Sequence, residues 1–213
     1  MSKQSELQRR SYSFEVRAAA ANDNGIRRVE GRPIVYGQRT NLGWFDEIIE
    51  PGALDETDLR DVRFLLNHDT SKVPMARSRR NNKNSTMQLI VDKDGMGMAA
   101  DVDTLNNTDA RALCSGIDRG DISGMSFMFS IDAEEWEDLE SDHPTRHILK
   151  IGTVVEVSAV TFPAYEQTEI STRCKQALDS ARSAVDTARE RRKSVDTDAL
   201  ELAKLKAKYL YNT

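Results

Sequence analysis

The sequence predicts a mainly β (α+β) protein: a compact, mostly antiparallel β-barrel with flanking helices and a C-terminal, coiled-coil-like helical extension. Two observations predict this fold. Across residues 11–167, short segments of alternating apolar and polar residues are separated by regular turn signals, with one helical segment among them. After Pro163 the composition changes, and small apolar residues recur at helical spacing through residues 168–213. Residues 1–10 are polar, and we expect them to form a flexible N-terminus.

The first half of the barrel domain is expected to contain four strands bounded by residues that favour turns. Residues 22–25 (NDNG) are a turn signal between the first two strands, and Pro51 with Gly52 ends the third. Residues 53–60 have room for one or two helical turns. The expected strands are residues 11–18, 26–36, 44–50 and 61–68.

The second half is expected to contain a hairpin, one helix and two longer strands. Asp94 and Gly95 are typical of a tight hairpin turn. Thr108 or Asp109 is expected to cap a helix over residues 109–118, and the acidic residues 133–145 are expected to form a loop. The strands expected here are residues 86–91, 96–102, 122–132 and 147–162, the last as one strand or a bent pair.

The composition is typical of a soluble globular protein, with 38% hydrophobic and 31% charged residues. No stretch approaches the roughly 18 apolar residues of a membrane span, and the polar N-terminus lacks the apolar core of a signal peptide. Cys114 and Cys174 have neither metal-type spacing nor a disulfide framework, so we expect two ordinary reduced thiols.

The net charge of −5 is unevenly distributed. Residues 171–213 carry ten Lys and Arg against six Asp and Glu, a local charge of +4 that leaves −9 for the rest. An acidic body argues against nonspecific nucleic-acid binding. The basic tail is expected to be a solvated helix face, with contact to nucleic acid or to an acidic partner as the alternative.

A small hydroxyl on a stiff strand makes Ser126 the candidate nucleophile. In strand alternation Met125, Phe127 and Phe129 share an apolar face, so Ser126 is displayed on the opposite face beside Gly124. A nucleophile needs this combination of a fixed position and an open approach. Taken alone, a serine on the polar face of a strand is more often an ordinary surface residue.

A nucleophilic serine also needs an imidazole that can take its proton. His68 is the best placed of the three histidines because it ends the strand expected at residues 61–68. The other two, His143 and His147, lie in the acidic loop and at its exit. The alternative for His68 is a hydrogen-bonded structural residue.

Glu156 is the candidate for the group that orients the imidazole. It interrupts the small and apolar run of residues 153–160, where a carboxylate is costly to bury unless it is paired. The alternative is a structural salt bridge to an arginine such as Arg77. Asp69 is a second candidate for the orienting role, but on a strand it would point away from its neighbour His68.

Several short segments within residues 30–165 carry a resemblance to a known family. They are residues 31–37 (GRPIVYG), 47–54 (EIIEPGAL), 65–69 (LLNHD), 73–77 (VPMAR), 119–129 (RGDISGMSFMF) and 155–164 (VEVSAVTFPA). In this order and spacing, the chain resembles the prohead (procapsid maturation) serine proteases of tailed bacteriophages, which are related to the herpesvirus assembly proteases.

The resemblance implies roles for three residues: Ser126 as nucleophile, His68 as general base and Glu156 as the orienting acid. It also implies a β-barrel with flanking helices and no metal or organic cofactor. The oxyanion donors cannot be identified, because backbone amides leave no residue signature. The sequence departs from the family at Met75 and Ala76, where a Gly-like turn is expected, and at residues 133–145, which have no counterpart.

By this resemblance, the chain is expected to be a serine endopeptidase inside the immature capsid, or prohead, in the host cytoplasm. Its expected substrates are scaffold segments of the major capsid protein, and the chain itself. Residues 168–213 are expected to dock on the scaffold, to act as a propeptide, or to mediate self-association. No membrane or specific nucleic-acid partner is expected. The alternative is a non-catalytic structural or scaffolding protein on the same barrel.

Overall fold

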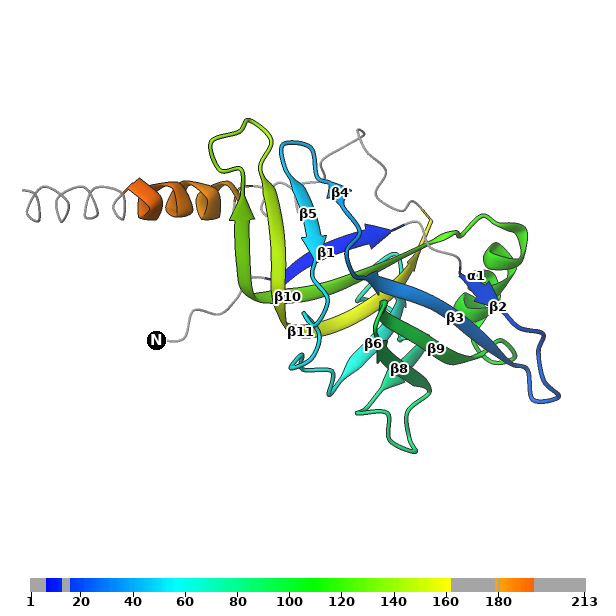
Figure 1. Ribbon diagram of the computed structural model, residues 1–213. Helices are drawn as coiled ribbons and strands as arrows, with labels where there is room; N and C mark the ends of the chain where they lie inside the picture. The colour runs from blue at the N-terminus through cyan, green and yellow to red at the C-terminus, as the bar shows by residue number, and fades with distance from the viewer. Residues whose placement is uncertain (1–6, 13–15, 162–178, 180, 194–213) are drawn as a thin grey trace, which may run out of the picture.

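The computed structural model describes residues 7–12, 16–161, 179 and 181–193, and in these residues the protein is mainly β, as predicted (Figure 1). The strands are β1 (Leu7–Tyr12), β2 (Arg17–Ala18), β3 (Ile26–Val35), β4 (Thr40–Asn41), β5 (Asp46–Ile49), β6 (Val62–Leu66), β7 (Ala76–Ser78), β8 (Met87–Asp92), β9 (Gly95–Asp103), β10 (Gly124–Glu137) and β11 (Thr145–Val160). Helix α1 (Thr108–Arg119) lies between β9 and β10 in sequence.

A seven-stranded sheet is built around the long antiparallel pair of β10 and β11. Its main order is β1-β10-β11-β5-β4, so β1 lies on the outer side of β10. Strand β11 also pairs in parallel with β5 near residues 145–148 and with β6 near residues 156–159, and β6 in turn pairs with β7. The second half of β11 therefore runs between β10 and β6, and this arrangement positions the candidate site.

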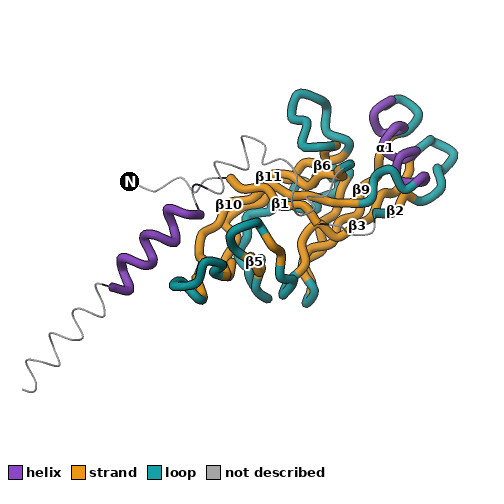
Figure 2. The backbone as a smooth tube through the Cα atoms, turned by 90° about the horizontal axis from the view of Figure 1, so that it is seen from above, coloured by secondary structure: helices purple, strands orange, loops and turns teal. Residues whose placement is uncertain are grey.

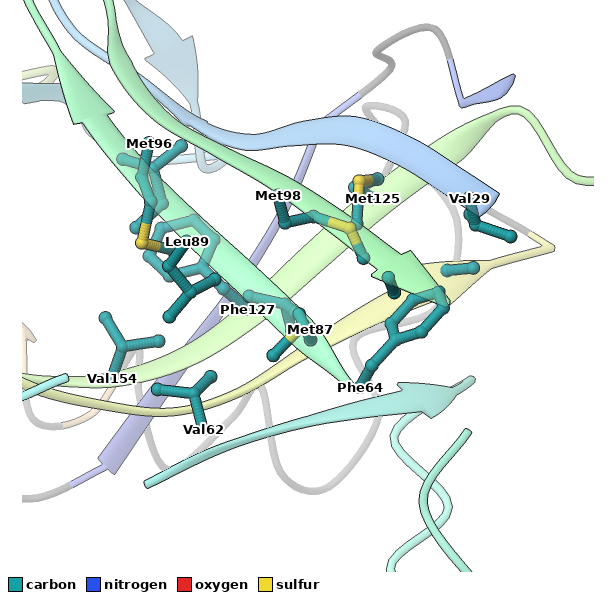
Figure 3. Close-up of a cluster of buried hydrophobic side chains, with 14 of the residues drawn as sticks. Val29, Val62, Phe64, Met87, Leu89, Met96, Met98, Met125, Phe127 and Val154 are labelled. Carbon is teal, nitrogen blue, oxygen red and sulfur yellow. The ribbon is translucent and has the colours of Figure 1, made fainter. Parts of the chain in front are cut away.

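The second sheet has four strands in the order β2-β3-β9-β8, and it packs against the first across the hydrophobic core. Figure 3 shows Met96, Met98 and Leu89 from this sheet among Phe127 and Val154 of the other. The described strands thus form two packed sheets and no closed barrel, so the predicted barrel is not confirmed. The physical reason is that β3 and β9 pair with β2 and β8 and not with strands of the larger sheet, so the ring of hydrogen bonds is never completed.

The structure adds the short strands β4 and β7, divides the strand expected at residues 11–18 between β1 and β2, and differs from the sequence prediction in three further segments. Residues 7–10, expected in a flexible N-terminus, form most of β1. Of residues 133–145, expected as a loop, residues 133–137 extend β10 and Thr145 begins β11, whereas residues 138–144 form the loop between them; charged side chains pair across this hairpin, such as Arg146 with Glu134. Residues 53–60 form turns and an isolated bridge at Asp58 in place of helical turns.

The predicted helix is confirmed, with a different cap. Asn107 is the N-cap residue, and its side-chain oxygen accepts hydrogen bonds from the backbone N–H groups of Asp109 and Ala110. Gly120 ends the helix in the left-handed region at φ 78°, where glycine has no steric penalty. Cys114 on this helix is a free buried thiol whose pKa is raised by burial, and Cys174 lies outside the described residues.

Residues 181–193 of the predicted C-terminal extension are helical and extend from the β10 side of the molecule, at the opposite end from α1 (Figure 2). Ala181 and Val185 are buried. Arg182 lies over the Trp44 ring, and Arg189 donates a 2.7 Å hydrogen bond to the Leu139 carbonyl. This part of the tail therefore packs on the protein itself. The rest of the extension, and with it the coiled-coil prediction, lies outside the described residues. No helix in the described ranges is long and apolar enough to span a membrane.

Candidate active site

His68 lies in a strained turn directly after β6. Asn67 and His68 both have left-handed backbones, with φ of 51° and 59°, which is uncommon for residues other than glycine. The Asn67 N–H donates to the Ala159 carbonyl at 2.9 Å, and its side-chain oxygen accepts from the Thr161 N–H. The turn is thus tied to the end of β11, and the imidazole is turned back toward that strand.

The structure brings His68 and Glu156 together, although 88 residues separate them in sequence. His68 Nδ1 lies 2.5 Å from Glu156 Oε1, and the Glu156 side chain is only 2% exposed. In a neutral imidazole, the nitrogen that faces the carboxylate carries the ring proton, and Nε2 is then the acceptor. The His68 side chain keeps 14% exposure, so the ring is not fully buried.

Ser158 links the two residues, and the sequence analysis missed it. Its hydroxyl donates to Glu156 Oε2 at 2.5 Å and accepts from the His68 backbone N–H at 3.2 Å. One buried hydroxyl thus holds both the carboxylate and the backbone of the strained turn. A usable signal was present: residues two apart on a strand share a face, so Ser158 had to lie beside Glu156.

Ser126 lies on the same side of the sheet as this cluster. It pairs directly with Ser158 across β10 and β11, and such opposed residues have Cβ atoms about 4.5–5.5 Å apart. The predicted open approach to Ser126 is wrong, because the residue is 0% exposed. Its hydroxyl donates to the carbonyl oxygen of Arg10 on β1 at 2.7 Å, and within the described residues no hydrogen bond joins it to His68.

Two alternatives were open from the sequence, Arg77 as the partner of Glu156 and Asp69 in place of Glu156, and neither is found at this site. Arg77 pairs with Asp61 at 2.6 Å and not with Glu156, and this pair lowers the pKa of Asp61. Asp69 accepts hydrogen bonds from the hydroxyl and backbone N–H of Ser71, which lower the pKa of its carboxyl. Neither Asp69 nor Arg77 is bonded to the imidazole.

The other two histidines contact carboxylates elsewhere. His143 Nε2 lies 2.9 Å from Asp46, and His147 lies between Glu50 and Glu137. The hydrogen bond that the His147 ring donates to Glu50, supported by Glu137, raises the pKa of His147. Both rings lie where β11 begins, whereas Glu156 lies near its end. In the part of the chain that the structure describes, no group of His, Cys, Asp or Glu is arranged to hold a metal ion.

A buried ionic cluster joins β1 to the body of the sheet. Arg10 forms ion pairs with both oxygens of Glu47 on β5, and its Nη2 also donates to Gln8 at 2.7 Å. Arg146 on β11 approaches Glu47 at 3.4 Å and pairs more closely with Glu134. Glu47 is 1% exposed, so its charge is compensated by these arginines and not by water.

Comparison with solved structures finds the capsid assembly protease of bacteriophage T4, gp21, with a TM-score of 0.44 and 13% identity over 76% of this chain and 100% of that chain. No curated protein matches the chain. The family model of the caudovirus prohead serine protease matches residues 12–182, which is most of the sequence and includes Ser126, His68 and Glu156. The chain therefore belongs to the caudovirus prohead serine protease family.

Proposed function

We propose that this chain is a serine endopeptidase in which Ser126 is the nucleophile, His68 the general base and Glu156 the acid that orients the base. The observation that carries the proposal is the 2.5 Å contact between His68 Nδ1 and Glu156 Oε1. Ser126 lies on the same face of the sheet as Glu156. Family membership independently supports a serine peptidase that acts in capsid maturation.

The proposed reaction is acyl transfer. Ser126 Oγ attacks the peptide carbonyl carbon as its proton passes to His68 Nε2, and the negatively charged Glu156 stabilises the resulting imidazolium. The tetrahedral intermediate collapses to an acyl ester when His68 returns this proton to the leaving amine. Water then repeats the sequence in place of the amine, which releases the new carboxyl end and restores the serine.

The proposed substrates are scaffold segments of the major capsid protein, cleaved inside the prohead, and the chain itself. Family membership supports contact with capsid proteins in general. The C-terminal extension, residues 168–213, is proposed to dock on the scaffold or to act as a propeptide.

A second candidate is a non-catalytic structural or scaffolding protein. The observation that favours it is the covered state of Ser126, whose hydroxyl donates to Arg10 and not to His68. The near approach of His68, Glu156 and Ser158 argues against it, since a buried carboxylate and a strained turn are costly to keep without a task.

Co-expression with the cognate capsid protein, followed by mapping of new termini by mass spectrometry, separates the two functions. We expect Ser126→Ala to abolish cleavage, since loss of a nucleophile from such a triad costs on the order of a millionfold in rate. Ser130→Ala is the matched control, because Ser130 is also buried on β10 and its hydroxyl only accepts from the Thr153 N–H. Undiminished cleavage by Ser126→Ala would remove the catalytic assignment.

A further inference from the structure

Strand β1 occupies the edge of the strand that carries Ser126. It pairs antiparallel with β10 from Leu7 opposite Ser130 to Tyr12 opposite Met125, and Ser11 lies opposite Ser126. Among the described strands, β1 pairs with β10 alone. It is therefore an edge strand, which can leave without breaking hydrogen bonds between other strands.

The contact between β1 and Ser126 is of the kind that a substrate would make. The Ser126 hydroxyl donates to the Arg10 carbonyl at 2.7 Å, so a peptide carbonyl of the same chain lies where a substrate carbonyl must come. The hydroxyl proton is thereby donated to the Arg10 carbonyl and not to His68, and the Ser126 side chain is 0% exposed. In this state the Ser126 hydroxyl is not accessible to another peptide.

The side chain of Arg10 is held in a buried acidic subsite. Arg10 pairs with Phe127 in the register, so its side chain lies on the core face, opposite to the face of Ser126. It is 7% exposed, its guanidinium lies 5.7 Å from the centre of the Phe129 ring, and it binds both oxygens of Glu47. A planar guanidinium with two bonds to one carboxylate is a specific form of recognition.

The subsite can exist without β1. Glu47 also lies 3.4 Å from Arg146, so departure of Arg10 would not leave its charge without a cation in the core. Because Arg146 pairs more closely with Glu134, Glu47 remains able to bind another cation. The site at Glu47 can therefore be occupied by Arg10 of β1 in one state and by a different basic side chain in another.

We propose that β1 occupies the substrate-binding edge of its own chain, and that this edge accepts an extended peptide, antiparallel to β10, with a basic residue at the Arg10 position. This inference rests on the proposed function, because the edge binds a substrate only if Ser126 is the nucleophile that attacks the carbonyl of that basic residue. Addition of a strand to a sheet edge gives affinity through the backbone, and Glu47 gives selectivity through one side chain. Substrate and β1 then compete for the same place.

The first test measures release of β1 in the full chain by hydrogen-exchange mass spectrometry of fragments that contain residues 7–12. We expect Arg10→Ala to speed exchange there by about tenfold or more, because a buried ion pair loses one partner. The control is Arg9→Ala, which removes a half-buried neighbour on β1 but keeps Arg10 and Glu47. If Arg10→Ala does not fold, Arg10→Lys keeps the positive charge but loses the two-bond contact of the guanidinium with Glu47, and it should speed hydrogen exchange in β1 several-fold. Equal exchange in the Arg9 and Arg10 variants would overturn the inference.

The second test measures peptide binding to Arg10→Ala, or to Arg10→Lys if only that variant folds, by fluorescence anisotropy. The probe is a peptide of residues 5–14 (SELQRRSYSF), compared with the same peptide carrying Glu at the Arg10 position. We expect the arginine peptide to bind at least about tenfold more tightly, since the glutamate would face Glu47. Equal affinity, or preference for the glutamate peptide, would overturn the basic subsite.

Neither test requires turnover, so their failure is distinct from failure of the proposed function. Accelerated exchange and selective binding, together with cleavage that survives Ser126→Ala, would keep the peptide-binding edge and remove the catalytic role. Cleavage that depends on Ser126, with unchanged exchange and no peptide preference, would keep the protease and remove this inference.

Discussion

Removal of the Ser158 hydroxyl should damage both the stability of the protein and its activity. In Ser158→Ala, Glu156 Oε2 loses its 2.5 Å donor, and the His68 N–H loses its 3.2 Å acceptor. Ser158 is fully buried, so water does not readily replace either bond. The two partners are the acid and the base of the proposed triad.

The expected size follows from the two bonds. A hydrogen bond to a charged group contributes about 1.5–3 kcal/mol and a neutral one about 0.5–1.5 kcal/mol, so the free energy of unfolding should fall by about 2–4 kcal/mol. The backbone of His68, at φ 59°, also loses a bond that holds it in a left-handed conformation. Because small displacements of a base are costly, kcat/KM should fall by about tenfold to a hundredfold.

The assay pairs urea unfolding with peptide cleavage per folded molecule, and Ser130→Ala is the control. The Ser130 hydroxyl accepts one hydrogen bond, from the Thr153 N–H at 3.1 Å, so its loss should cost about 1 kcal/mol and leave kcat/KM unchanged. If Ser158→Ala lost stability but kept full kcat/KM in the folded fraction, Ser158 would be a structural residue only. Equal stability losses in the two variants would refute the two-bond argument.

Three further predictions concern the acid, the base and a distant histidine. Glu156→Gln should lower kcat by about a hundredfold to ten-thousandfold while the folded fraction persists, since the third member orients the base; an unchanged kcat with a lower Tm would show a structural pair. His68→Ala should be inactive in capsid-protein cleavage, whereas His143→Ala should cleave normally, and the reverse result would place the base elsewhere. The pKa of His147 is raised, first by its hydrogen bond to Glu50. A raised histidine pKa stabilises the fold below the unfolded pKa of about 6.5, and this stability is lost as pH rises through the folded pKa. In thermal melts, His147→Gln should therefore lower Tm at about pH 6 and change it little at about pH 9, and an equal loss at both pH values would contradict this.

Local patterns in the sequence were sufficient to predict most of the elements. The hairpin expected at Asp94 and Gly95 joins β8 and β9, although its two turn residues are Lys93 and Asp94 and Gly95 already belongs to β9, and the helix predicted over residues 109–118 is α1. Alternation also identified the paired strands β10 and β11. These signals act over a few residues, so they report on elements but not on how strands join into sheets, and for that reason they predicted mostly β structure correctly but did not give its arrangement as two sheets.

The candidate site was predicted partly for the right physical reason. The cost of burying an unpaired carboxylate drew attention to Glu156, and the structure gives it two partners, His68 and Ser158. His68 was expected on the strand face, whereas the strand ends at Leu66 and a left-handed turn directs the ring. Asp69 was set aside by an argument from strand geometry that does not apply within a turn, and in the structure its carboxylate accepts hydrogen bonds from Ser71.

The accessibility of Ser126 could not be predicted, because it depends on a strand more than a hundred residues away in sequence. Strand β1 has no apolar alternation that would predict it, and its pairing with β10 is supported by the ion pair of Arg10 with Glu47. If the proposed exchange of β1 and substrate holds, the activity of the isolated chain is set by the fraction of molecules in which β1 is displaced. A displaced fraction of about 1% would lower the apparent kcat/KM about a hundredfold with the triad intact. Weak proteolysis by the purified chain would then reflect the strength of the ion pair between Arg10 and Glu47. Arg10→Ala should raise the rate of proteolysis.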